Sequence, residues 1–137
     1  LATVDQVNFC FDGDGGGVKA ADQALQQMVG MADDASRVNF IFLPAGHDPD
    51  SFVKSDGAEA FASLAEKPVS LVEYLTSTLL QGCELQFAEG RARCAAKGRE
   101  FWQIASPSMQ GVLVDFCSDV VRLSPDDILE IWSAQKT

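Results

Sequence analysis

The feature that most constrains the fold is the order of three segments within residues 7–43. Val7–Phe11 (VNFCF) and Val38–Leu43 (VNFIFL) are short, apolar and β-prone, and turn residues follow each of them, so both predict buried strands. Between them, Val18–Met31 predicts an amphipathic helix, because its apolar residues recur at helical spacing: Ala21, Leu25, Met28 and Val29. A strand, a helix and a strand joined by short loops predict a parallel βαβ unit with a right-handed crossover.

The rest of the chain shows helical periodicity only. Two short helices are expected at Ser51–Ser55 and Gly57–Glu66, and four further helical patterns follow at Leu71–Leu80, Phe87–Ile104, Met109–Leu123 and Asp126–Gln135. Ser106 and Ser124 each precede a proline and are expected N-caps. We therefore predict an α/β part, residues 1–68, followed by an all-α part, residues 69–137, in a chain that is mostly helical overall.

Length and charge limit the classes of protein that this chain can belong to. Its 137 residues, 47% of them hydrophobic, suffice for one domain or two small subdomains. The net charge of -10 argues against a nucleic-acid grip formed by this stretch alone, because phosphate binding usually requires a basic face. No apolar run approaches the roughly 18 residues of a membrane span, so no membrane contact is expected.

The cysteines suggest a reducing environment, and the N-terminus suggests that the chain is a segment of a longer protein. Cys10, Cys83, Cys94 and Cys117 form no C-x-x-C pair and lie in apolar or helical patterns. We interpret them as reduced core thiols of a cytoplasmic protein, and zinc is not expected. Because the chain starts at Leu1 and enters a strand almost at once, we expect it to be a piece of something longer.

Acidic side chains follow both predicted strands. Asp12 and Asp14 come directly after the first strand, and Asp48 and Asp50 lie in the loop after the second. Parallel strands end at the same edge of a sheet, so these four carboxylates are expected to converge. Like charges held close together repel, which favours a bound cation. All-oxygen ligands favour magnesium, manganese or calcium.

The glycines that follow suggest a phosphate near these carboxylates. Gly15, Gly16 and Gly17 let the backbone turn sharply and expose N–H groups at the start of the next helix. Neither a calcium EF-hand loop nor a P-loop fits the spacing of this segment. Simpler interpretations stay open, because Asp-Gly-Asp is also typical of a solvated turn or a helix cap, and Asp48-Pro49-Asp50 can be a turn followed by a capping aspartate. His47, the only histidine, is expected to be a loop residue.

Two long stretches carry a family resemblance. FCFDGDGGGVKAADQAL followed by FIFLPAGHDPDSFV resembles the second half of the TOPRIM metal-binding module of bacterial replicative DNA primases of the DnaG type. The downstream segments EGRARCAAKG and SPDDILEIW are similar to the helical subdomain that closes the RNA polymerase domain of that family. The resemblance implies a partial TOPRIM module at residues 1–68 and the helical subdomain at residues 69–137.

The resemblance also implies a function. It implies a nucleotidyltransferase, a DNA-directed RNA polymerase that makes short RNA primers on single-stranded DNA during replication, with Mg²⁺ or Mn²⁺ as cofactor. Asp12 and Asp14 match the D-x-D metal ligands of the family and would be catalytic, and Asp48 and Asp50 match its second acidic pair. In the full-length enzyme the partners would be the DNA template and ribonucleoside triphosphates. The replicative helicase would bind through regions outside this chain.

The chain departs from the family pattern in ways that limit what it does alone. Gly15 and Val18 stand where the family usually has basic residues, and the family's catalytic glutamate, template-binding subdomain and zinc module lie upstream of this segment. The segment alone is therefore expected to be inactive, and self-association through uncovered edges of a two-stranded sheet is expected. The alternatives are a TOPRIM module of a topoisomerase or recombination mediator, and a non-catalytic interaction domain. Tyr74, the only tyrosine, lies in a helical pattern and is expected to be a core residue.

Overall fold

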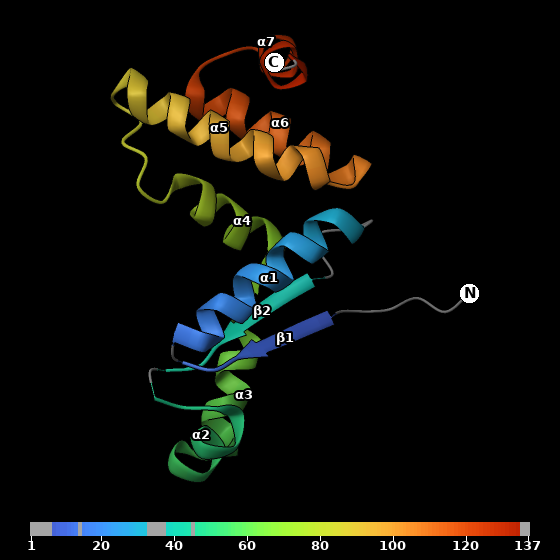
Figure 1. Ribbon diagram of the computed structural model, residues 1–137. Helices are drawn as coiled ribbons and strands as arrows, with labels where there is room; N and C mark the ends of the chain where they lie inside the picture. Colours follow the sequence, from blue (N-terminus) through green and yellow to red (C-terminus); the bar gives the residue numbers. More distant parts are fainter. Residues whose placement is uncertain (1–6, 14, 33–37, 45, 135–137) are drawn as a thin grey trace, which may run out of the picture. The chain divides into compact units, whose positions relative to one another are not determined.

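A computed structural model describes residues 7–13, 15–32, 38–44 and 46–134, and Figure 1 shows how their helices and strands are arranged. The described part is mostly helical with one small sheet, as the sequence predicted. The elements are β1 (Val7–Phe11), α1 (Gly15–Met31), β2 (Val38–Phe42), α2 (Pro49–Asp56), α3 (Ala58–Glu66), β3 (Val69–Ser70), α4 (Leu71–Leu80), α5 (Ala88–Ile104), α6 (Pro107–Val121) and α7 (Pro125–Ser133). None of the helices in these ranges is long and apolar enough to cross a membrane.

The described chain packs as two compact units. The α/β unit contains the described residues up to Met28 and from Val38 to Tyr74, and the helical unit contains residues 29–32 and 75–134. The last residues of α1 thus pack with the helical unit, and the first residues of α4 pack with the α/β unit. The division into a TOPRIM part, residues 1–68, and a helical subdomain, residues 69–137, concerns the subdomains of the family and stays a prediction.

The sheet confirms the predicted βαβ arrangement. β1 runs parallel to β2 with Val7 opposite Val38 and Phe11 opposite Phe42, and α1 connects the two strands. The sheet has a third strand that the sequence analysis did not predict, because β3 is only two residues long and shows no alternating pattern. β3 pairs antiparallel with β2, so β2 is central and β1 is an edge strand among the described residues.

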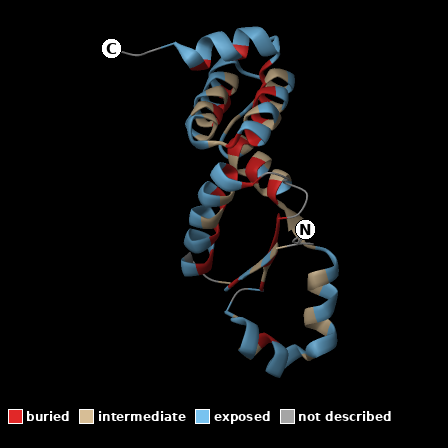
Figure 2. Cartoon of the chain, turned by 90° about the vertical axis from the view of Figure 1, so that its right-hand side faces the viewer, coloured by how far each residue is buried: buried red, intermediate tan, exposed pale blue. Residues whose placement is uncertain are grey.

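Aromatic rings fill the core of the α/β unit. Phe11 of β1 and Phe40 of β2 lie with their ring centroids 5.7 Å apart, and Phe40 packs edge-on against Tyr74 of α4 at 5.1 Å. The Tyr74 hydroxyl donates a hydrogen bond to Asp22 Oδ1 of α1 at 2.6 Å. Tyr74 is therefore half-buried rather than fully buried, because its polar end reaches out to this carboxylate. Figure 2 shows the buried residues of the chain in red.

The helical unit is built on the contact of α5 with α6 and α7. Gly98 of α5 is buried, and a Cβ placed there would lie 2.7 Å from Cys117 Sγ and 2.8 Å from Trp132 Cζ2. Only glycine permits so close an approach of α6 and α7 to α5. Ser106 and Ser124 are N-caps with proline at the first helical position, which confirms the prediction.

The cysteines do not all lie in the core. Cys94 and Cys117 are fully buried in the helical unit, Cys83 is half-buried, and Cys10 is exposed on β1; none forms a disulfide. The prediction of four core thiols is wrong for Cys10, because alternate residues of β1 face opposite sides and position 10 falls on the exposed side.

Candidate functional site

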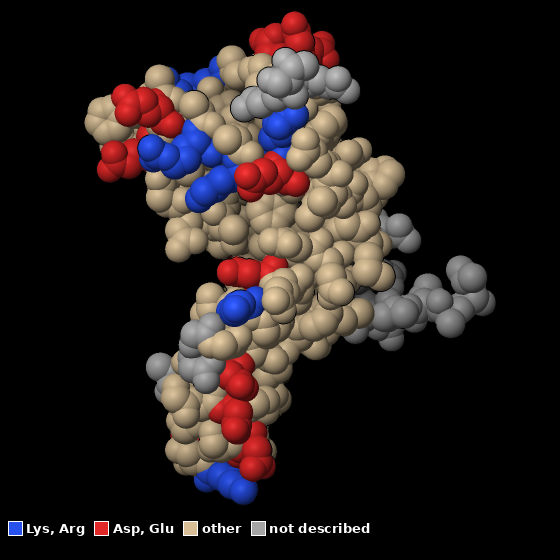
Figure 3. All heavy atoms as spheres, in the orientation of Figure 1, with Lys and Arg blue, Asp and Glu red and all other residues tan. Residues whose placement is uncertain are grey.

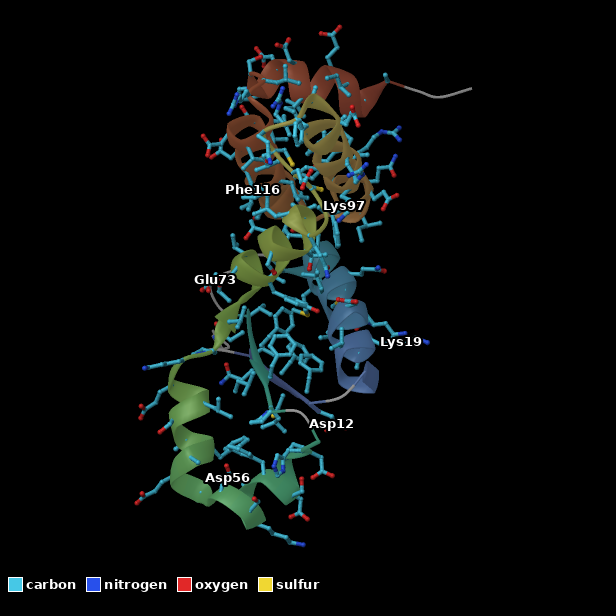
Figure 4. All side chains as sticks on the ribbon, turned by 90° about the vertical axis from the view of Figure 1, so that its left-hand side faces the viewer. Asp12, Lys19, Asp56, Glu73, Lys97 and Phe116 are labelled. Carbon is cyan, nitrogen blue, oxygen red and sulfur yellow. The ribbon has the colours of Figure 1, made fainter. Side chains whose placement is uncertain are left out.

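The loops after β1 and β2 are joined by backbone hydrogen bonds. The Gly13 N–H donates to the His47 carbonyl at 2.9 Å, and the Gly46 N–H donates to the Gly13 carbonyl at 3.3 Å. A Cβ placed on Gly13 would lie 1.8 Å from the Pro44 carbonyl oxygen, so no side chain fits between the loops. We call residues 12–13 and 46–50 the acidic edge. Figure 4 shows Asp12 at the end of β1, in this region of the α/β unit.

The first turn of α1 packs against the backbone of Asp12. A Cβ placed on Gly17 would lie 1.9 Å from the Asp12 carbonyl oxygen and 2.7 Å from its carbonyl carbon. Because glycine allows this approach, α1 begins at Gly15, three residues before the predicted start. The first turn carries no acidic side chain, so no carboxylate of its own offsets the positive end of the helix dipole beside Asp12.

Asp48 caps α2, which was one of the simpler interpretations left open by the sequence. Its Oδ1 accepts a hydrogen bond from the Ser51 N–H at 2.7 Å, and Ser51 Oγ accepts one from the Asp48 N–H at 3.0 Å, which completes a capping box. The Ser51 backbone N–H is the main reason that the pKa of the Asp48 carboxyl lies below its ordinary value. Asp48 is exposed and is ionised at neutral pH.

Asp50 lies in the first turn of α2 and forms an ion pair with Lys54. Asp50 Oδ2 lies 3.1 Å from Lys54 Nζ, and the two side chains are 80% and 76% exposed. Solvent-exposed pairs of this kind contribute only about 0–1 kcal/mol. The Asp50 carboxylate therefore exchanges this partner for another cation at little cost.

His47 is a residue of the loop between β2 and α2, as predicted. Its Nδ1 lies 3.1 Å from Ser51 Oγ, and its ring packs edge-on against Phe52 with the centroids 5.5 Å apart. These contacts link the loop after β2 to the first turns of α2. Gly13 and Ser51 also shape the edge and were not predicted from the sequence, although an aspartate directly before a proline is a signal of a helix N-cap.

The structure places three of the four predicted ligands in the segments that follow β1 and β2, two of them in loops and Asp50 in the first turn of α2. Asp12, Asp48 and Asp50 are exposed there, and Asp14 lies outside the described residues. Within the described ranges, no three His, Cys, Asp or Glu side chains lie close enough to hold a metal ion together. The donors are nevertheless the hard carboxylate oxygens that Mg²⁺ and Mn²⁺ prefer, so the residue types fit such an ion. The expected convergence is not seen for the three described carboxylates, and their role as metal ligands stays a prediction.

The chain is similar in sequence to bacterial DNA primases. No protein-family profile matches it. It is 33% identical over 133 residues to the DNA primase of Neisseria meningitidis serogroup A, covering 96% of this chain and 22% of that protein. It is 34% identical over 127 residues to the DNA primase of Pseudomonas aeruginosa, covering 91% of this chain and 19% of that protein. The chain thus spans about a fifth of the length of these curated relatives.

Solved structures show the same relationship. A DNA primase domain from Pseudomonas aeruginosa matches with a TM-score of 0.84 and 32% identity over 96% of this chain and 41% of that one. A DnaG primase catalytic domain bound to ssDNA matches with a TM-score of 0.75 and 27% identity over 90% of this chain and 39% of that one.

Sequence and fold together show that the chain is similar to part of the catalytic core of DNA primases. More specifically, it is homologous to a segment of the catalytic core of bacterial DnaG-type DNA primases, which confirms the resemblance predicted from the sequence.

Proposed function

We propose that this chain is part of a DNA primase, a DNA-directed RNA polymerase that synthesises short RNA primers on single-stranded DNA during replication. The observation that carries the proposal is the similarity to DNA primases over nearly the whole chain, on a fold that matches the DnaG catalytic core. The acidic edge lies at the carboxyl ends of β1 and β2, where open α/β folds hold their ligands. A topoisomerase or recombination-mediator module is not favoured, because the relatives and structural neighbours above are primases.

In this proposal the edge is a TOPRIM metal site. Asp12, Asp14, Asp48 and Asp50 would hold Mg²⁺ or Mn²⁺, with Asp12 and Asp14 as the catalytic pair. Bound metal would neutralise the triphosphate and polarise the reacting oxygens. The carboxylates would act as ligands rather than as acids or bases.

The residues around the carboxylates would position the substrate. The close approach at Gly17 sets the N-terminus of α1 beside Asp12, and the positive end of a helix dipole attracts phosphate. The capping box fixes the Asp48 side chain against the first turn of α2. The hydrogen bonds of Gly13 hold the two loops at a fixed separation. A triphosphate bound here would thus meet a preorganised edge.

The partners would act through the larger protein. Because this chain has a net charge of -10, the DNA template would be bound by basic surfaces outside it. The chain alone would be inactive. Ribonucleoside triphosphates would bind at the acidic edge, and the replicative helicase of the primosome elsewhere. A cytoplasmic location and self-association through the free edge of β1 remain predictions.

A chimeric primase tests the proposal. The chain would replace the matching segment of the Pseudomonas aeruginosa DNA primase, to which it is 34% identical, and primer synthesis would be measured on a single-stranded template. We expect primers from the chimera, none from its Asp12→Asn or Asp48→Asn variants, and full activity from Asp115→Asn, an exposed control on α6. A folded chimera that binds the template but makes no primers, or an active Asp12→Asn variant, would contradict the proposal.

A further inference from the structure

A groove of about 570 Å³ lies entirely within the helical unit, between α5, the end of α6 and α7. Its floor is a stripe of small side chains along α5: Ala88, Ala92, Ala95 and Ala96. The successive spacings are four, three and one residues, which keep all four positions on one side of the helix. Because these side chains are small, the floor leaves room for an incoming segment.

The walls of the groove expose large apolar side chains to water. Ile131 of α7 is 52% exposed and Leu123, which follows α6, is 38% exposed, whereas Trp132, which also lines the groove, is buried. An apolar patch that lines a concave surface is typical of a binding site. The groove thus favours a ligand that brings apolar side chains.

The charge of the groove is opposite to that of the chain. Three charged residues line it, and all are arginines: Arg91, Arg99 and Arg122. The chain as a whole has 20 acidic and 10 basic residues, so a groove whose charged lining residues are all basic differs clearly from the average charge of the chain. On the face drawn in Figure 3, Lys and Arg side chains lie over α5 together with Asp and Glu side chains, so the absence of acidic residues is a property of the groove lining and not of the whole helix surface. The groove therefore complements an anionic ligand.

Two of these arginines are held in place by backbone carbonyls. Arg99 donates from Nε to the Trp132 carbonyl at 3.0 Å and from Nη2 to the Ala134 carbonyl at 3.2 Å. Arg91 donates from Nη1 to the Leu85 carbonyl at 2.8 Å. A guanidinium has five N–H donors, so both groups keep further donors for a carboxylate. Because their side chains are already ordered, binding costs them less entropy.

We propose that this groove docks an acidic amphipathic peptide segment of a protein partner. Apolar side chains of the segment would lie on the alanine stripe between Leu123 and Ile131, and its carboxylates would pair with Arg91, Arg99 and Arg122. The mostly apolar and aliphatic lining favours a peptide over single-stranded nucleic acid, which is gripped by basic grooves with several stacking aromatics. This interaction surface goes beyond the proposed polymerase function and does not depend on it.

Selection of peptides on the 137-residue chain tests this inference. A phage-displayed library of random peptides would be selected on the chain, and enriched sequences would be synthesised with a fluorescent label for anisotropy titrations. We expect enriched peptides to combine acidic and apolar residues, with binding that weakens as salt rises.

Matched variants locate the binding on the chain. Arg122→Glu should weaken binding at least about tenfold, because it puts like charge opposite the peptide. Arg93→Glu, an exposed arginine of α5 outside the groove, should leave binding within about twofold. Ala92→Trp should fill the groove and abolish binding, whereas Ala62→Trp on α3 should not.

Several results would overturn the inference. These are a selection without enriched acidic and apolar peptides, binding that is unchanged in Arg122→Glu, and a single-stranded oligonucleotide that binds the chain and loses affinity in Arg122→Glu. Circular dichroism shows whether each variant is folded. If Ala92→Trp does not fold, the charge-reversal pair at Arg122 and Arg93 decides the outcome alone.

Discussion

Replacing Gly17 with alanine should destabilise the α/β unit, although the same change strengthens most helices. A glycine-to-alanine change inside a helix usually gains about 1 kcal/mol from propensity. At Gly17, however, the new Cβ would lie 1.9 Å from the Asp12 carbonyl oxygen, and the nearest atoms are all backbone. Helix and loop would have to separate by about 1 Å, and overpacking of this kind costs about 1–3 kcal/mol. The clash should cost about 3 kcal/mol, the upper end of that range, because backbone atoms yield less than side chains. Less the gain of about 1 kcal/mol from propensity, we expect a net loss of about 2 kcal/mol.

Gly111 of α6 provides the matched control. It is also a helical glycine, but a Cβ placed there would meet no atom within 4 Å. Gly111→Ala should therefore stabilise the chain by about 0.5–1 kcal/mol, since propensity acts there without a clash. The two variants differ in the surroundings of the new methyl group, not in the chemistry of the substitution.

Urea denaturation measures both changes. Far-UV circular dichroism follows the whole chain, and fluorescence follows the helical unit because Trp102 and Trp132 both lie there. Gly17→Ala should lower the midpoint followed by circular dichroism and should also weaken Mn²⁺ binding at the displaced Asp12. A Gly17→Ala variant as stable as Gly111→Ala would refute the close packing of α1 on the Asp12 backbone.

Three further predictions concern other contacts. Tyr74→Phe removes the hydrogen bond to Asp22 and should lower the free energy of unfolding in urea by about 1 kcal/mol. Burial, and then this hydrogen bond, raise the pKa of Tyr74. The parent chain should therefore lose the contribution of this bond as the pH rises above about 10, whereas the stability of the variant should not change for this reason. Asp48→Ala removes the N-cap of α2 and should lower the melting temperature; an unchanged melting temperature would contradict the cap. Because folding lowers the pKa of Asp48, the stabilisation by its carboxylate should be present above about pH 4 and should disappear in the parent chain as the pH falls below that value. With a disulfide reagent, Cys10 should react in the native chain while the buried thiols of α5 and α6 react only after unfolding, and equal rates would contradict their burial.

The sequence predicted the elements that have a strong local signal. The βαβ unit follows from two apolar segments around an amphipathic one, and the caps of α6 and α7 follow from Ser106 and Ser124 before proline. β3 could not be predicted, because a two-residue strand has no periodicity and forms only by pairing with Asn39 and Phe40. The exposure of Cys10 depends on which face of β1 the rest of the unit covers, which the pattern VNFCF does not reveal.

The candidate site was predictable in residue type but not in geometry. Asp12, Asp48 and Asp50 were identified because they follow two parallel strands. The sequence could not decide whether Asp48 caps a helix, because a cap and a metal ligand both need an exposed carboxylate. The tight approaches at Gly13 and Gly17 involve backbone atoms of Pro44 and Asp12, and such tertiary contacts leave no trace in local spacing.

Titration with Mn²⁺, followed by electron paramagnetic resonance of the free ion, tests most directly whether the acidic edge is a metal site. The account predicts that the chain binds Mn²⁺ and that Asp12→Asn and Asp50→Asn each weaken binding at least about tenfold, while Asp115→Asn on α6 leaves it unchanged. Binding that is the same in the parent chain and in the Asp12→Asn and Asp50→Asn variants, or no binding by the parent, would contradict it.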